Sequence, residues 1–510
     1  MEETQVIRNR LITSLCFSEM LITFIVLYLV ITVGVGVYAS KRIRTGDDYV
    51  NAGRNLPFFF NSFALFAMWY GAETIFGAAG RFMESGLIGV IEEPLGAALC
   101  LVLFGMFLAK PLYKRNILTI ADLFKEAYGE KVEFISSCFM LVTYVGYIAA
   151  QMVALGILLK LIIGLELSTG ILISSAVVTA YTFAGGMWAV SITDFFQSIM
   201  IVLGLCVLCF SLVTDIGGIE KVVESTPKGF FNILPEGNAE SINEWVTAWM
   251  VIGLGSLASQ DIFQRVNSAR SVKVAVYSTY FGAGMYLFFS IIPMLIALCV
   301  RILDPARVQA GTSVDFQEII PQIAVSSSNP FVQILFLGAL VSAILSTCSG
   351  ALLAPSAILA ENILKPMIEG KTKRRLDVWM VRLSVVIMSL VSTMLAMSES
   401  DIYQMVGDSG VLALTSILVP TFYAIYSKKP SVWGAMGAMF IGALGWASKE
   451  YASYYSAWYA ALPVSAWIIG GVSSLLGYWG GQIAEHIWHS EGRLAHVLVR
   501  HDSGRRSRMK

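Results

Sequence analysis

A stretch near the N-terminus, from Asn61 to Gly80, is apolar enough to lie in a membrane but carries a carboxylate, Glu73, in its middle. Glycines surround this carboxylate, among them Gly71 and Gly77. A charged side chain near the bilayer centre costs at least about 2.5–3.5 kcal/mol, and a helical glycine costs about 1 kcal/mol relative to alanine. A helix that opens partway to bind a ligand would have both features, because its freed carbonyls face a cavity instead of lipid. The stretch therefore favours a broken membrane helix; the alternative is a buried, unbroken helix with one satisfied glutamate.

The composition of the whole chain supports a membrane setting. Of its 510 residues, 56% are hydrophobic and 14% are charged, whereas soluble proteins carry about 25% charged residues. The formal net charge is zero, so charge gives no indication of a nucleic-acid partner. All four histidines follow the last apolar run and the seven cysteines lack metal-ligand spacing, which argues against a buried transition-metal site. We therefore expect an all-α polytopic membrane protein that is not an enzyme.

Hydropathy predicts about thirteen transmembrane helices, because one span needs about 20 apolar residues. The spans are expected near residues 19–39, 58–80, 88–109, 132–163, 168–185, 190–213, 243–263, 274–300, 330–363, 377–398, 403–426, 431–448 and 460–484. Clusters of Lys and Arg follow the odd-numbered spans, as they should if these loops all face the cytoplasm. This pattern predicts an extracytoplasmic N-terminus (residues 1–18), a cytoplasmic C-terminus and a location in a plasma or bacterial inner membrane.

The order of the spans also indicates an internal repeat. After the leading helix at 19–39, the segments 58–213 and 243–426 each contain five spans, and the two sets begin on opposite sides of the membrane. Two sets of five spans with opposite topology are what an inverted repeat gives. Two additional spans at 431–484 and a basic cytoplasmic tail at 485–510 complete the expected organisation.

The ninth predicted span carries a run of hydroxyl side chains, ALVSAILSTCSGALLAPSA. Ser346 and Thr347 lie three and four residues after Ala343, so both share a helical face with its carbonyl. Hydroxyl and carbonyl oxygens are hard ligands that suit alkali and alkaline-earth ions. Because the run contains no carboxylate, it favours a neutral oxygen cage for a monovalent ion, completed by carbonyls of the broken second span. The alternative is that these hydroxyls bond to their own helix or hold neighbouring helices together.

Other carboxylates lie in the sixth and seventh predicted spans. Asp194 begins the sixth span, and Asp261 ends the seventh in the sequence LASQDIFQR. Asp261 and Arg265 are four residues apart, so an ion pair across one helical turn is one interpretation of that carboxylate. A functional role for Asp261 is the other, and the sequence leaves both open.

Four motifs, in this order, resemble those of the sodium:solute symporter family. They are AGRNLP leading into ALFAMWYGAETIFGAAG, then YTFAGGMWAVSITDFFQ, then QDIFQR, then SAILSTCSGALLAPSAILAENI. This family includes sodium-coupled transporters of proline, pantothenate, choline, sialic acid and galactose, and the resemblance covers nearly the whole chain. It implies a LeuT-type core of two inverted five-helix repeats. It also implies a symporter that imports a small polar organic solute with sodium by alternating access, with the bilayer, sodium and the solute as partners.

The resemblance further implies an ion site. The sodium ligands would be the carbonyls of Ala67, Tyr70 and Ala343 and the hydroxyls of Ser346 and Thr347. Asp194 matches a family carboxylate beneath this site, where some members bind a second sodium ion through two further hydroxyls. This sequence matches one of these hydroxyls with Ser349 but has Gly350 at the other, so Asp194 and Ser349 are candidate ligands of a second sodium ion and the sequence leaves open whether one ion or two bind.

Six positions match substrate-lining positions of the family, namely Trp69, Glu73, Thr74, Glu93, Ser259 and Gln260. Carboxylates together with aromatic faces suit ammonium groups, and we expect no Lys or Arg of the core helices near Glu73, Glu93, Trp69 and Tyr70. We therefore expect an ammonium compound such as choline, or a zwitterionic amino acid, although helix ends and sodium itself can also bind an anionic group.

Two other functions fit the same sequence. One is a proton-coupled carrier of the same fold, in which Asp194 or Glu73 relays protons. The other is a membrane sensor without transport, which is less favoured because the sequence has only about 25 residues after the last predicted span. Dependence on sodium would distinguish a symporter from both.

Overall fold

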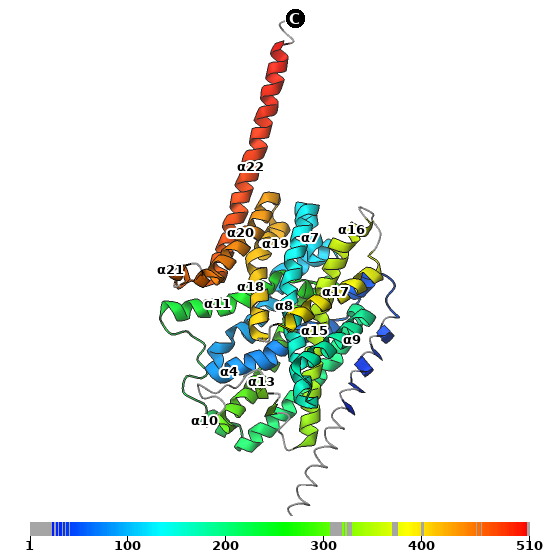
Figure 1. The fold of residues 1–510 in the computed structure, drawn as a ribbon, viewed down its shortest axis with the longest axis vertical. Coiled ribbons are helices and arrows are strands. Elements are labelled where there is room, and N and C mark those ends of the chain that lie inside the picture. The colour runs from blue at the N-terminus through cyan, green and yellow to red at the C-terminus, as the bar shows by residue number, and fades with distance from the viewer. Residues whose placement is uncertain are drawn as a thin grey trace, which may run out of the picture.

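The chain is helical in the computed structural model (Figure 1). The structure describes residues 23–506 except 25–26, 29, 33, 36, 40, 306–318, 321, 324–328, 370–375, 399–401, 455 and 461. Residues 1–18, expected outside the membrane, are not among those described, and the leading span at 19–39 is described only in part. The described residues also contain an isolated parallel bridge between Leu56 and Ala269.

The described first half of the chain contains two long helices, α8 and α9, and a series of shorter ones. In order these are α2 (Gly46–Asn51), η1 (Ala52–Arg54), α3 (Phe58–Trp69), η2 (Glu73–Ala78), α4 (Ala79–Ser85), η3 (Gly86–Val90), η4 (Ile91–Gly96), α5 (Ala97–Leu103), η5 (Phe104–Leu108), α6 (Ala109–Arg115), α7 (Ile120–Tyr128), α8 (Glu130–Ile163), α9 (Leu167–Ile216) and α10 (Ile219–Glu224).

The second half follows the same pattern. Its helices are α11 (Ala239–Gly255), η6 (Ser256–Ala258), α12 (Gln260–Ser268), α13 (Val272–Leu303), α15 (Pro330–Ile358), η8 (Leu359–Leu364), α16 (Lys365–Glu369), α17 (Val378–Ala396), α18 (Ile402–Ser416), α19 (Leu418–Tyr426), α20 (Val432–Glu450), η9 (Ala452–Tyr454), α21 (Ala457–Ala460) and α22 (Ala466–Arg506).

The helix that was predicted to be broken is broken in the structure. The α-helix α3 ends at Trp69, and Tyr70 leaves helical geometry with φ −91° and ψ 61°. The chain becomes helical again as the π-helix η2, which begins at Glu73. The carboxylate therefore lies directly after the interruption, where it meets other side chains instead of lipid.

A second interruption lies in the seventh predicted span. There α11 and η6 meet α12 at a bend of 54°. Ser259 forms the joint in an extended conformation, with φ −82° and ψ 140°. A third bend of 44° separates α18 from α19. All three breaks border the pocket described below.

Among the described residues, six helical segments are long and apolar enough to cross a membrane, or eight if each of two bent pairs is one span. One of the six, α9, is a pair of helices divided at Gly186, which lies between the predicted spans 168–185 and 190–213. Gly186 has φ +52°, and a Cβ there would lie 2.6 Å from the Tyr49 carbonyl oxygen, so glycine is required on both grounds. The predicted number of thirteen transmembrane helices stays a prediction.

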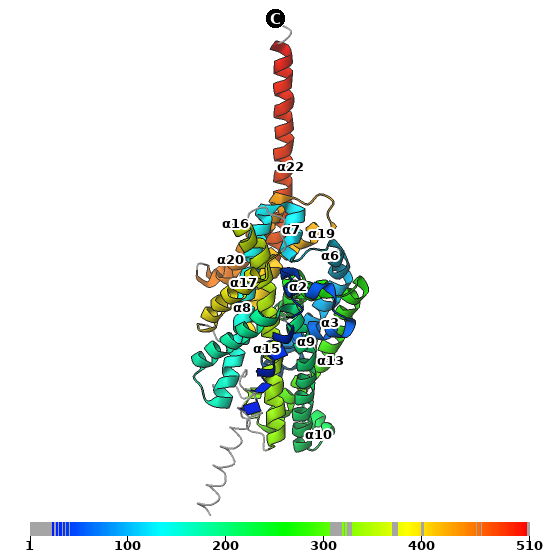
Figure 2. The ribbon, with the colours of Figure 1, turned by 90° about the vertical axis from the view of Figure 1, so that its right-hand side faces the viewer.

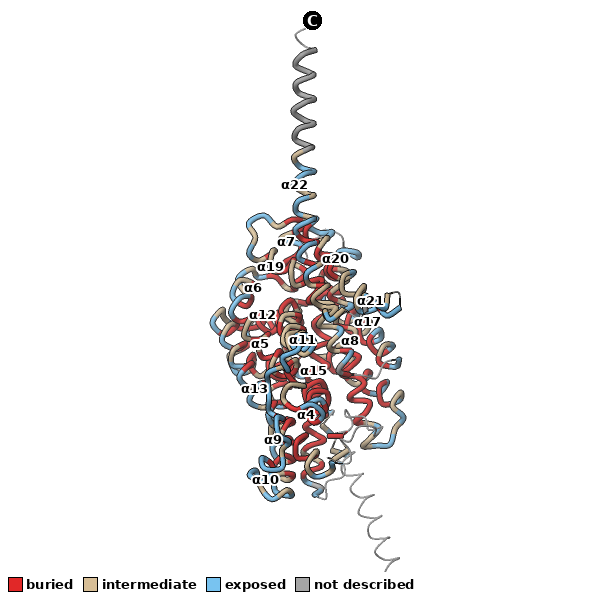
Figure 3. Tube along the Cα trace, turned by 90° about the vertical axis from the view of Figure 1, so that its left-hand side faces the viewer, coloured by how far each residue is buried: buried red, intermediate tan, exposed pale blue. Residues whose placement is uncertain are grey.

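The central helix of the bundle is α15. In the most apolar part of the segment Phe331–Ile368, which contains α15, 83% of the residues are buried. The corresponding fraction for α9 is 33%. The helix α15 packs against α8, α9 and α3; Figure 2 shows it between α8 and α9, and Figure 3 colours it largely as buried. The hydroxyl run of the ninth predicted span therefore lies in the protein interior.

The C-terminal helix α22 projects from one end of the bundle (Figure 1). It continues to Arg506, whereas the last span was predicted at 460–484 and the tail after it. α22 packs against α20 at Gly437 and Gly477, where a Cβ on Gly437 would lie 2.2 Å from the Gly477 carbonyl oxygen. Glycine thus permits the close approach of these two helices.

Candidate ion and solute site

The end of α3 and the middle of α15 meet at the predicted ion site. The hydroxyl of Thr347 donates to the carbonyl oxygen of Ala67 at 3.0 Å. The backbone at Gly71 also lies against Thr347, because a Cβ there would be 2.6 Å from the Thr347 hydroxyl. The break in the second span is thereby held against the hydroxyl run, as the sequence predicts for an oxygen cage formed by both.

The other predicted ligands are buried in the same region. The side chains of Tyr70, Ala343 and Ser346 are fully buried. The hydroxyl of Tyr70 donates away from the cage, to the Phe289 carbonyl at 2.8 Å, which leaves its backbone carbonyl as the group available for an ion. Neutral hydroxyl and carbonyl oxygens suit a hard monovalent cation, so the residues present fit sodium.

Asp194 lies next to this cage and is fully buried. Its Oδ1 accepts a short hydrogen bond from the Ser346 hydroxyl. Its Oδ2 lies 3.7 Å from Nη2 of Arg265, which is also fully buried. The hydroxyl of Ser349, the predicted ligand of a second sodium ion, donates instead to the Ser346 carbonyl of its own helix at 3.0 Å.

The structure does not form the Asp261–Arg265 side-chain ion pair considered from the sequence. The Asp261 carboxylate accepts from the hydroxyl of Tyr144 at 2.9 Å and from the amide of Ile262 at 3.0 Å. The Arg265 guanidinium instead donates to the backbone carbonyl of Asp261 through Nη1 and faces the Asp194 carboxylate with Nη2. Asp261 and Arg265 share a helix face, but each side chain therefore interacts with a buried partner on a neighbouring helix instead.

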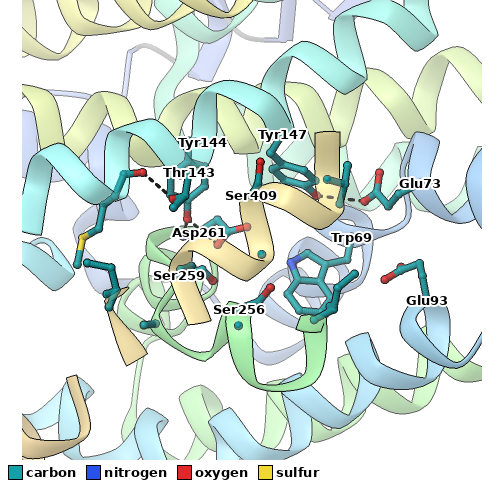
Figure 4. A pocket seen from close by; sticks show the side chains of 18 residues that line it. Trp69, Glu73, Glu93, Thr143, Tyr144, Tyr147, Ser256, Ser259, Asp261 and Ser409 are labelled. Carbon is teal, nitrogen blue, oxygen red and sulfur yellow. Dashed lines mark hydrogen bonds between the residues drawn. The ribbon is translucent and has the colours of Figure 1, made fainter. Parts of the chain in front are cut away.

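A pocket lies between the broken helices, α8 and α18, and carboxylates occur on both sides of it (Figure 4). In this view Glu73 and Glu93 lie on one side of the Trp69 ring and Asp261 on the other. The pocket has about 720 Å³ of empty volume, including the part open to solvent.

Hydrogen bonds fix the carboxylates on the Trp69 side of the pocket. Glu73 accepts from the Tyr147 hydroxyl at 3.1 Å and from Nε2 of Gln151 at 2.7 Å. Glu93 accepts from the Thr74 hydroxyl at 3.1 Å. Both glutamates are thus held by neutral donors, and no described Lys, Arg or His is among the eighteen residues that line the pocket.

Four of the six predicted substrate positions line this pocket, namely Trp69, Glu73, Glu93 and Ser259. The hydroxyl of Ser259 has no hydrogen-bond partner among the described residues, so it is available to a ligand. Thr74 lies behind the pocket, where its hydroxyl also bonds to the Trp69 carbonyl and the Tyr286 hydroxyl. Gln260 lies elsewhere, with its Oε1 accepting from the backbone amide of Ile120 at 2.7 Å.

The helix α8 contributes pocket residues that were not predicted from the sequence. Tyr144 and Tyr147 both line the pocket, and Gln151 supports Glu73 from behind. A signal was present, because these three polar side chains recur at intervals of three and four residues in an otherwise apolar run. Ser409 of α18 also lines the pocket, and nothing in its sequence context distinguished it.

Comparison with known proteins gives the family. The sequence profile of the sodium:solute symporter family matches residues 49–442. The chain belongs to the sodium:solute symporter family. The resemblance seen in the four motifs is therefore confirmed, and the family together with the apolar helices makes this a multi-pass membrane protein.

Several family members have similar sequences. The high-affinity choline transporter 1 of Drosophila melanogaster is 25% identical over 82% of this chain and 69% of its own length. The human high affinity choline transporter 1 is also 25% identical, over 83% of this chain and 75% of its own length. The high-affinity proline transporter PutP of Bacillus subtilis is 27% identical, over 80% of this chain and 88% of its own length.

Solved structures share the fold. A Na⁺-coupled sialic acid symporter in a substrate-bound outward-open state superposes with a TM-score of 0.75 at 18% identity, covering 91% of this chain and 98% of its own. The nucleobase-cation-symport-1 family transporter MHP1 gives a TM-score of 0.52 at 15% identity, covering 85% of this chain and 93% of its own. These similarities confirm the LeuT-type fold that the motifs implied.

Proposed function

We propose that this protein imports a small solute bearing an ammonium group, driven by sodium. The observation that carries the proposal is the charge of the pocket. Glu73, Glu93 and Asp261 line it together with Trp69 and two tyrosines, and its described lining contains no basic side chain. Carboxylates and aromatic faces attract an ammonium cation, whereas a solute with only negative charge would meet carboxylates without a protein counter-ion.

The relatives agree with this class of solute. Choline is a quaternary ammonium compound and proline is a zwitterion with an ammonium group, and transporters named for both are among the similar proteins. The sialic acid symporter shares the fold but is only 18% identical, so it does not bear on the solute. The chemistry common to choline and proline is what the pocket of this chain would bind.

Sodium would bind between the broken second span and α15. Its ligands would be the carbonyls of Ala67, Tyr70 and Ala343 and the hydroxyls of Ser346 and Thr347. The ion would replace the hydrogen bond between Thr347 and Ala67 and hold the two helices together in the state that accepts solute. One sodium ion moving inward across 100 mV supplies about 2.3 kcal/mol, and solute and sodium must strengthen each other's binding equally.

The proposed topology follows the charges of the loops. We place the leading helix at 19–39, the two inverted repeats at 58–213 and 243–426 and the additional helices at 431–484 in a plasma or bacterial inner membrane. The N-terminus would be outside and the C-terminus in the cytoplasm. Cysteine accessibility from each side of the membrane at exposed loop positions would test this arrangement.

The experiment that tests the solute class is uptake into proteoliposomes under an inward sodium gradient. The panel would contain choline, proline, a neutral sugar and a monocarboxylate without an amine. We expect saturable uptake of at least one ammonium compound and none of the monocarboxylate. Sodium-driven uptake of the monocarboxylate alone would contradict an ammonium solute while leaving sodium coupling intact.

A further inference from the structure

Arg265 is an unusual residue for the centre of a membrane protein. Its side chain is fully buried, on the short helix α12 after the second broken span. Its Nε donates to the Ala64 carbonyl of α3 at 2.9 Å, and its Nη1 donates to the Asp261 carbonyl at 3.4 Å. A buried guanidinium needs a counter-charge as well as hydrogen bonds. The carboxylate facing it is that of Asp194, with Nη2 and Oδ2 3.7 Å apart.

The end of this guanidinium fills the space beside Gly350 of α15. A Cβ built on Gly350 would lie 2.3 Å from Nη2 of Arg265 and 3.2 Å from its Cζ. Any side chain at position 350 would therefore require the guanidinium to move. Position 350 is also where the family resemblance places a hydroxyl ligand of the second sodium ion in some members. In this chain the cationic end of Arg265 lies where that hydroxyl would be.

The two oxygens of the Asp194 carboxylate face a hydroxyl and the guanidinium of Arg265, which is a permanent cation of the protein. One carboxylate oxygen accepts from Ser346, and the other faces Arg265. Neither Asp194 Oδ2 nor Arg265 Nη2 has a hydrogen-bond partner among the described residues, so their mutual attraction is what compensates these two buried atoms. The hydroxyl of Ser349 donates to its own helix.

We propose that the Arg265 guanidinium takes the place of a second sodium ion beside Asp194, so that each transport cycle carries one sodium ion. The proposal rests on the sodium coupling proposed above and adds its stoichiometry. A mobile cation at Asp194 would be repelled by the fixed guanidinium and would find no space beside Gly350. Because Arg265 bonds to α3 and faces Asp194 of α9, it joins the helices on both sides of the ion cage without leaving during the cycle.

The test counts sodium ions bound to the purified full-length chain, with ²²Na⁺ at equilibrium. We expect one ion per wild-type chain and two per Arg265→Ala/Gly350→Ser chain, in which the fixed cation is removed and a hydroxyl ligand is supplied. Arg382→Ala is the matched control, because the Arg382 Nε also donates to a backbone carbonyl, that of Phe183, but its guanidinium lies over the Phe183 ring and not against Asp194. This control is expected to bind one ion.

A second measurement, of thermal stability, distinguishes a folded variant from a misfolded one. The melting temperature of wild type, titrated with NaCl against KCl at constant ionic strength, should saturate as a single site, and the double variant should show a larger sodium-dependent rise. Two ions on the wild-type chain, or the same number of ions on the wild type and on a folded double variant, would overturn the proposal. Zero ions on the wild type and one on the double variant would instead retain the role of Arg265 and contradict sodium binding at Ser346 and Thr347.

Discussion

Gln151 bridges Glu73 and the backbone of the broken helix. Its Nε2 donates to the Glu73 carboxylate at 2.7 Å, and its Oε1 accepts from the Ala72 amide at 3.1 Å. One side chain from α8 thus satisfies an amide freed by the break and orients a pocket carboxylate. A buried polar group without a partner costs about 1–3 kcal/mol, so this side chain matters for both stability and binding.

We predict that Gln151→Leu destabilises the protein by about 1–3 kcal/mol and also weakens solute uptake, because Glu73 and the Ala72 amide each lose a partner. Thermal unfolding in detergent and uptake kinetics would measure the two effects. Gln197→Leu is the control, since Gln197 is equally buried but donates to Tyr28 at 3.0 Å, outside the pocket. A loss of stability without any change in uptake for Gln151→Leu would show that the bridge is only structural.

Glu73→Gln should raise the KM for an ammonium solute by about tenfold or more. The amide keeps the size of the side chain but removes the charge, and hydrogen bonds to charged groups contribute about 1.5–3 kcal/mol. Concentration-dependent uptake would measure this change. Glu361→Gln serves as the comparison, because Glu361 pairs with Lys365 at 2.7 Å and does not line the pocket. Equal KM values for the wild type and Glu73→Gln would exclude Glu73 as the counter-ion.

Trp69→Ala should weaken binding of an ammonium solute more than Trp69→Phe does. Loss of the aromatic face removes about 0.5–2 kcal/mol of cation–π attraction, and phenylalanine keeps part of it. Competition of unlabelled solute against labelled solute would rank the three proteins. Trp379→Ala, at a half-exposed position on α17, should leave the affinity unchanged. If the phenylalanine and alanine variants bound equally well, the cation–π contribution of the ring would be contradicted.

Gly186→Ala should destabilise the protein by more than about 1 kcal/mol, because it places a Cβ at positive φ and against the Tyr49 carbonyl. Gly284→Ala is the matched control within a helix. No described atom lies within 4 Å of a Cβ at Gly284, so that variant should be neutral or gain up to about 1 kcal/mol from helix propensity. Melting temperatures of the two variants, compared with that of the wild type, provide the measurement. Equal stability of both variants would contradict the requirement for glycine at the division of α9.

The sequence predicted the features that depend on local composition. The carboxylate and glycines between Asn61 and Gly80 indicated a broken helix, which the structure contains after Trp69. The spacing of Ala343, Ser346 and Thr347 placed these residues on one face of a buried helix. The motifs around them gave the family, which the profile match over residues 49–442 confirmed.

The features that the sequence missed depend on contacts between distant segments. Arg265 has Asp261 one turn away, but it faces Asp194, which precedes it by 71 residues and belongs to another helix. Tyr144 reaches Asp261 from α8 in the same way. Sequence spacing gives the neighbours on one helix but does not give the neighbours across a bundle. The boundaries of the last helix were also missed, because α22 continues well beyond its apolar portion.

We propose that sodium bound at Ser346 and Thr347 drives uptake. The most direct measurement compares solute accumulation in proteoliposomes under an inward sodium gradient and under an inward proton gradient without sodium. The proteins would be the wild type, Ser346→Ala/Thr347→Ala, and the control Ser356→Ala, whose hydroxyl donates to the Leu352 carbonyl of its own helix at 2.6 Å. We predict accumulation with sodium alone, lost in the double variant and kept in the control. Equal accumulation under the proton gradient, or full sodium dependence in the double variant, would contradict the claim.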